Sequence, residues 1–146
     1  MPDCVVDSSV VALANGDIAG RRPGNLFDQR LTVLEQIASG VRRMRYNPKL
    51  LQEYGELIQQ YRNDVIEAVF AIIDDPRRSL RVPRSSLSRQ HYDLAIRTCG
   101  WPIHDQHLLA AAIGGDYPSI AVTEQRLNQC AAAILRHFRV RIEHLA

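Results

Sequence analysis

The segment that most constrains the fold is the short apolar run of residues 4–6, which ends at Asp7. An apolar run without alternation is typical of a strand buried on both faces of a parallel sheet. A second such run, residues 118–122, ends at Thr123. Open parallel sheets bind ligands outside the carboxyl ends of their strands. Asp7 is therefore a candidate functional residue, although a helix-capping role explains an acid there equally well.

Helical and extended patterns alternate along the chain. We expect a weak strand over 41–46 and an edge strand over 138–142, with a turn at 15–17 and a loop over 20–24. The periodicity predicts helices in the following segments: 10–14, 26–39, 47–61, 63–73, 88–98, 104–113 and 127–135. Asn47, followed by Pro48, is expected to cap the helix over 47–61. Strands that alternate with helices favour an α/β fold, here a three-layer α/β/α sandwich around a mainly parallel sheet. The length of 146 residues fits one domain over residues 1–146.

Composition excludes several classes of protein. No stretch of about 18 apolar residues is present, so no membrane span is expected. The N-terminus lacks a basic region followed by a long apolar run, which argues against a signal peptide. The three cysteines are widely spaced and form no CxxC pair, so neither a zinc ribbon nor a disulfide framework is expected. We therefore expect a cytoplasmic protein.

Two further acids lie on helical faces that point inward. Glu53 lies at the edge of an apolar stripe in the helix over 47–61, and Asp105 lies on the apolar face of the helix that it opens. His107 is predicted to point away from that face toward solvent, so metal binding by His104 and His107 is not expected. A buried carboxylate needs a partner. If both acids meet Asp7, a cation must lie among them, and oxygen ligands suit Mg²⁺ or Mn²⁺.

The densest basic segment is the connection over residues 77–89. It carries arginines and serines and is broken by Pro83; its arginines are Arg77, Arg78, Arg81, Arg84 and Arg89. Such a segment is either a solvated loop or a rim that contacts phosphates. Seventeen of the eighteen basic residues of the chain are arginines, and the remaining one is Lys49. Phosphate contacts in this protein would therefore be mostly guanidinium forks.

Four blocks of the sequence resemble those of PIN domains, a family that includes the VapC-type toxins of toxin–antitoxin pairs. The blocks are residues 5–11, residues 46–54 with Leu51-Gln52-Glu53-Tyr54, residues 105–112, and residues 120–123. They occur in the family order and span nearly the whole chain.

The resemblance implies a PIN-like fold and a Mg²⁺- or Mn²⁺-dependent endoribonuclease that cleaves phosphodiesters with metal-activated water. It implies an RNA substrate, an antitoxin partner and a homodimer. Asp7, Glu53 and Asp105 match the metal-binding catalytic acids of the family. Ser9 and Thr123 match its supporting hydroxyl positions. The arginines that we expect to contact RNA are Arg77, Arg78, Arg81 and Arg84.

The fourth block departs from the family pattern. PIN domains commonly read Thr-x-Asp there, whereas this chain has Thr123-Glu124-Gln125. Gln125 can accept a hydrogen bond from water but adds no negative charge. Glu124 is adjacent and could take the place of the missing acid, although one helical residue turns it by about 100°. This departure from the family pattern affects the expected catalytic strength and the expected number of bound metal ions. It does not affect the expected fold.

Two other function classes compete with a nuclease. A phosphotransferase with Asp7 as nucleophile would need a second Asp at position 9 or, in a receiver domain, a late Lys. Ser9 occupies the first position, and Lys49 is the only lysine. The stronger alternative is a PIN-like module that binds RNA or protein and has a weakened or inactive metal site.

Overall fold

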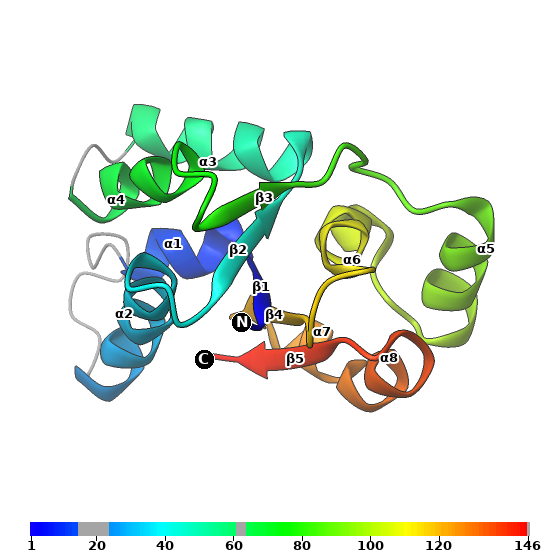
Figure 1. Ribbon diagram of the computed structural model, residues 1–146. Helices are drawn as coiled ribbons and strands as arrows, with labels where there is room; N and C mark the ends of the chain where they lie inside the picture. Colours follow the sequence, from blue (N-terminus) through cyan, green and yellow to red (C-terminus); the bar gives the residue numbers. More distant parts are fainter. Residues whose placement is uncertain (15–23, 61–63, 146) are drawn as a thin grey trace.

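The computed structural model describes residues 1–14, 24–60 and 64–145 (Figure 1). The turn expected at 15–17 and residues 20–23 of the expected loop lie outside the described residues, as does residue 63, where a helix was expected to begin. Gly24, the last residue of that expected loop, instead begins a helix.

Five strands form one sheet in which every neighbouring pair is parallel. The strands are β1 (Asp3–Val6), β2 (Arg43–Tyr46), β3 (Ser79–Arg81), β4 (Ser119–Val122) and β5 (Arg141–His144), in the order β3-β2-β1-β4-β5. This confirms the α/β class and the parallel sheet. All residues of β1 and β4 are buried, as expected for apolar runs without alternation.

Two strands differ from the expectation. The basic segment over 77–89 was expected to lack regular structure, but Ser79–Arg81 forms edge strand β3. It is held by pairing with β2, including a bond from the Met44 N–H to the Arg78 carbonyl at 2.8 Å. Such long-range pairing leaves no local pattern in a short edge strand. The other edge strand lies at Arg141–His144 rather than at 138–142, because Phe138 ends a helix.

Helices cover both faces of the sheet (Figure 1). One layer contains α1 (Ser8–Ala14), α2 (Gly24–Ala38), α3 (Pro48–Gln60) and α4 (Asp64–Ile73). The other contains α5 (Arg89–Tyr92), α6 (Gln106–Ala112) and α8 (Ala131–Phe138). The short α7 (Gln125–Asn128) directly follows β4. The helix expected over 127–135 is thus divided between α7 and α8, and the one expected over 88–98 continues from α5 as a π-helical turn, Asp93–Thr98.

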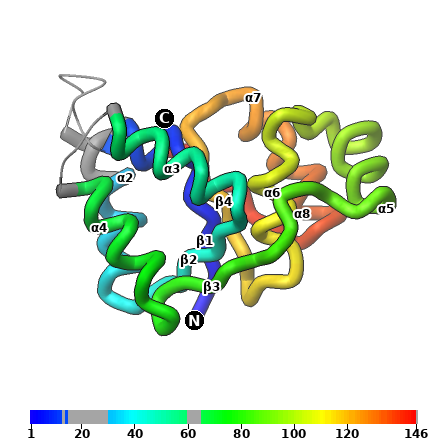
Figure 2. Tube along the Cα trace, turned by 90° about the horizontal axis from the view of Figure 1, so that it is seen from above, coloured from blue at the N-terminus to red at the C-terminus, as the bar shows by residue number. Residues whose placement is uncertain are grey.

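The carboxyl ends of three central strands carry polar residues: Asp7 after β1, Asn47 after β2 and Thr123 after β4. The chain passes from β1 to β2 and β3 on one side, and β4 and β5 lie on the other side (Figure 2). The crevice between β1 and β4 is therefore the topological switch point, where open α/β sheets bind ligands. The Asp7 N–H donates to the Ala121 carbonyl at 3.0 Å and so fixes the acid at this crevice.

Within the described part of the chain, no helix has both the length and the apolar character needed to cross a membrane. The three cysteines are buried and unpaired with one another.

Candidate functional site

Asp7 is buried at the end of β1 and is held by a chain of two hydroxyl groups. Ser9 Oγ donates to Asp7 Oδ2 at 2.8 Å, and Thr123 Oγ1 donates to Ser9 Oγ at 2.9 Å. Burial raises the pKa of the Asp7 carboxyl to about 6, and the negative charges of Asp105 and Glu53 contribute in the same direction. The Ser9 bond partly offsets this rise. The two expected supporting hydroxyls thus form one relay to the first acid.

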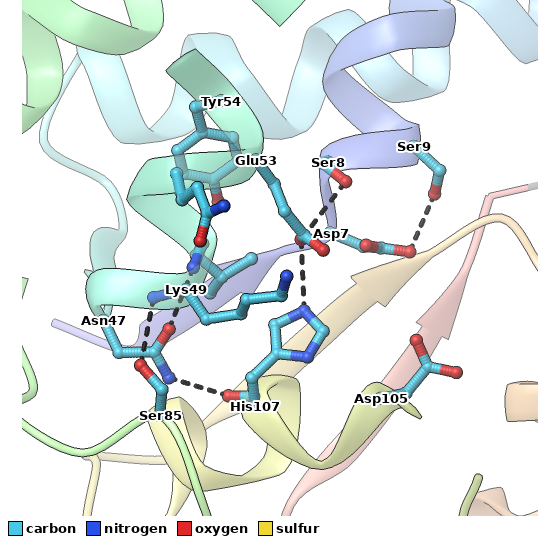
Figure 3. A network of polar contacts seen from close by, with 12 residues as sticks. Asp7, Ser8, Ser9, Asn47, Lys49, Glu53, Tyr54, Ser85, Asp105 and His107 are labelled. Atoms are coloured by element: carbon cyan, nitrogen blue, oxygen red, sulfur yellow. Dashed lines mark hydrogen bonds and ion pairs between the residues drawn. The ribbon is translucent and has the colours of Figure 1, made fainter. Parts of the chain in front are cut away.

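Glu53 projects from α3 toward Asp7 and is bound by two donors (Figure 3). His107 Nε2 lies 3.1 Å from Glu53 Oε1, and Ser8 Oγ donates to the same oxygen at 3.4 Å. Burial opposes ionisation of Glu53. The hydrogen bond and charge of His107, with the charge of Lys49, outweigh burial and lower the pKa of this carboxyl. Glu53 is therefore ionised at neutral pH.

The position of His107 corrects the sequence prediction. Its side chain was expected to face solvent, but the residue is only 4% exposed and contacts Glu53. The prediction assumed that one side of this helix faces water. In fact every residue from His107 to Ala112 in α6 is buried, because the helix lies against the sheet and also meets α3. A helix buried on all sides leaves no polar face from which the direction of a histidine can be read.

Asn47 joins the elements around the site. Its Oδ1 accepts from the Leu50 N–H at 3.1 Å, which confirms the expected cap of α3. Its Nδ2 donates to the His107 carbonyl at 2.9 Å and to the Arg84 carbonyl at 3.1 Å. The Tyr54 hydroxyl donates to the Val6 carbonyl and ties α3 to the end of β1. These bonds fix the helix that carries Glu53 against both β1 and α6.

Asp105 lies at the start of α6 on the other side of Asp7, apart from Glu53 (Figure 3). It is half-buried, and its backbone carbonyl accepts from Trp101 Nε1 at 2.8 Å. Burial raises the pKa of its carboxyl, and the charge of Glu124 adds to this effect. The negative charge of Glu124 thus favours the protonated form of Asp105. Gln125 begins α7 as an exposed residue.

No protein-family model, curated protein or solved structure matches the chain. The chemistry of the site is therefore inferred from its own donor and acceptor atoms.

The acids match the donor chemistry of a hard cation without forming a closed metal site. In the described ranges, no group of three or more His, Cys, Asp or Glu residues could hold a metal ion as they lie. However, within these ranges no hydrogen bond reaches Asp7 Oδ1 or Glu53 Oε2, whereas the second oxygen of each carboxylate is bound. Mg²⁺ keeps several waters and needs only one or two protein carboxylates. The donor set therefore fits Mg²⁺ or Mn²⁺ held mainly by Asp7 and Glu53.

The arginines expected to contact RNA fall into two pairs. Arg77 and Arg78 each lie 3.2 Å from the Asp75 carboxylate. Arg81 and Arg84 are exposed and have no ion pair among the described residues. The backbone of Arg84 is tied to the acid site through Asn47. Of the four arginines, Arg81 and Arg84 are thus the pair whose charge is not offset by Asp75.

Sequence reasoning missed three contributors: His107, Ser8 and the tethers of Asn47. The signal available for His107 was its position two residues after Asp105. For Asn47, the sequence indicated the cap but not the two carbonyls that its amide reaches.

Proposed function

We propose that this protein is a Mg²⁺- or Mn²⁺-dependent endoribonuclease of the PIN type. One observation carries the proposal. Asp7 and Glu53 come from different elements beside the β1/β4 crevice, and each has one oxygen bound by the protein and one oxygen without a hydrogen bond from the described residues. Ligands that are anchored in this way are typical of functional metal centres.

In the proposed reaction, each acid of the site has a separate role. A bound Mg²⁺ or Mn²⁺ would supply the Lewis acidity that phosphodiester hydrolysis needs. Asp7, with a pKa of about 6, is mostly ionised at neutral pH and provides negative charge at the crevice. Asp105 has a raised pKa and no hydrogen bond to its carboxylate from the described residues, so it is suited to accept a proton from water. Glu124 keeps a further negative charge near Asp105.

The proposed RNA path begins at the carboxyl end of β3 and runs along the segment that follows it. Arg81 and Arg84 would contact backbone phosphates, and Lys49 extends from α3 toward Glu53 (Figure 3). Arg77 and Arg78 would contribute less, because Asp75 already neutralises part of their charge. A toxin role, an antitoxin partner and a homodimer rest on the sequence resemblance alone and remain predictions.

The proposal is tested with the full chain, a structured RNA, and Mn²⁺, Mg²⁺ or EDTA. We expect cleavage with either metal and none with EDTA, and we expect Asp7→Asn and Glu53→Gln to abolish it. Glu56→Gln is the matched control, because Glu56 is an exposed acid of the same helix. Cleavage that persists in both site variants would contradict the proposal.

A second candidate is a module that binds RNA without cutting it. It is favoured by the lack of a closed group of metal ligands in the described residues and by the amide at Gln125. RNA binding without cleavage at saturating Mn²⁺, unchanged by Asp7→Asn, would support this candidate instead.

A further inference from the structure

We propose that His107 is a positioning residue: its Nε2–H holds Glu53 Oε1 and thereby directs Oε2 toward the divalent cation. This inference rests on the proposed function, because it concerns the cation that the acids would bind. The bond itself, at 3.1 Å, joins two residues that are 54 positions apart in the chain.

The imidazole is itself fixed in place. His107 is almost fully buried in α6, and its backbone carbonyl accepts a hydrogen bond from the Asn47 amide at 2.9 Å. Asn47 also caps α3, the helix that carries Glu53. The backbones of donor and acceptor are therefore held relative to each other by one buried side chain. A donor fixed in this way can set the direction of a long, flexible glutamate side chain.

The pattern of bonds at Glu53 indicates positioning rather than simple neutralisation. Both donors, His107 and Ser8, reach the same oxygen, Oε1. The charge of His107 also lowers the pKa of Asp7 and of Asp105, but among the described residues its ring forms a hydrogen bond to a single acid, Glu53. Asp7 and Glu53 are thus held alike, each with one carboxylate oxygen bound by protein donors. Outer partners of metal-binding carboxylates act in this manner.

The test measures Mn²⁺ affinity of the full chain by calorimetry in the absence of RNA. His107→Leu removes the donor, whereas the amide nitrogen of His107→Gln can still reach Glu53. We expect His107→Leu to weaken Mn²⁺ binding by about 10- to 100-fold, and His107→Gln to restore most of the affinity. His104→Leu is the matched control, because His104 is exposed and lies three residues away.

A measurement on the unaltered chain keeps the inference testable if His107→Leu does not fold. The Nε2–H resonance of His107 is followed by NMR while Mg²⁺ is added. Positioning predicts that this proton stays protected from exchange with water when the cation is bound. Its disappearance on Mg²⁺ binding would show that the cation displaces His107, which would overturn the inference.

The calorimetric outcomes separate the two proposals. Mn²⁺ binding that is equal or tighter in His107→Leu would overturn the role of His107 and leave the metal-dependent function intact. An unaltered chain that binds no Mn²⁺ would overturn both.

Discussion

The side-chain amide of Asn47 lies 2.9 Å from the backbone carbonyl of His107, across 60 residues of sequence. This bond joins the carboxyl end of β2 to α6, which lies on the other face of the sheet from α3 (Figure 1). Because the same side chain caps α3, one buried residue sets the distance between the helix with Glu53 and the helix with His107. The geometry of the candidate site thus depends on a residue that does not itself bind the acids.

Asn47→Ala is expected to destabilise the protein by at least about 3 kcal/mol. The change combines a missing helix cap, about 1 kcal/mol, with two carbonyls left without their donor, about 1–3 kcal/mol each if they stay buried. Urea denaturation measures the change. Asn47→Asp separates the two effects, because it keeps the cap acceptor but cannot donate to the carbonyls. Asn128→Ala, at the end of α7, is the control; Asn47→Asp with unchanged stability would contradict the role of the tethers.

Asp7→Asn is expected to stabilise the metal-free protein above pH 6. The pKa of Asp7 rises from 3.8 to about 6 on folding, so the folded state binds the proton more tightly than the unfolded state does. The resulting stabilisation is present below pH 3.8 and is lost as pH rises through about 6. Its size is on the order of 3 kcal/mol, from about 1.36 kcal/mol per pKa unit. Denaturation at pH 4.5 and 7.5 should show a larger gain of Asp7→Asn at the higher pH.

The hydroxyl relay to Asp7 should be visible in the titration of its carboxyl. The Ser9 hydrogen bond lowers the pKa of Asp7, so Ser9→Ala is expected to raise this pKa above about 6. Thr123→Val should have a smaller effect in the same direction, because it removes only the group that orients Ser9. Carboxyl ¹³C NMR titration measures both. Ser39→Ala, an exposed serine at the end of α2, should leave the Asp7 curve unchanged.

Two glycine substitutions are expected to change stability in opposite directions. A Cβ at Gly115 would lie 3.0 Å from both Arg45 Cδ and Asp3 Oδ2. These atoms belong to a buried ion-pair cluster, so Gly115→Ala should destabilise by about 1–3 kcal/mol through overpacking. Gly55→Ala places its Cβ in open space within α3 and should stabilise by up to about 1 kcal/mol. Thermal denaturation compares them, and similar melting temperatures would contradict the packing argument.

The two arginine pairs should differ in their effect on RNA binding. Arg81→Ala with Arg84→Ala is expected to weaken binding to single-stranded RNA and to reduce the slope of log K against log salt by about 0.7 for each phosphate that is no longer neutralised. Arg77→Ala with Arg78→Ala should have a smaller effect because of Asp75. Binding is measured by fluorescence anisotropy at several salt concentrations with the Asp7→Asn variant, which is expected not to cleave the RNA. Equal effects of the two double variants would contradict the assignment.

Local sequence patterns predicted much of the architecture. The apolar runs of β1 and β4 are buried strands of a parallel sheet, because only strands covered on both faces can be apolar throughout. The cap at Asn47 and the start of α3 followed from side-chain chemistry next to Pro48. Asp7 was found because a carboxylate directly after a buried strand lies at the ligand-binding edge of such a sheet.

The tertiary structure decided what local patterns do not contain. Strand β3 exists because β2 offers it hydrogen bonds from distant residues, and α6 is buried on all sides because both the sheet and α3 contact it. That burial turns His107 from an expected surface residue into the partner of Glu53. The sequence by itself therefore determined strands β1, β2 and β4 and the acids. Only the packing of elements distant in the chain determined which atoms bind those acids and which oxygens remain available.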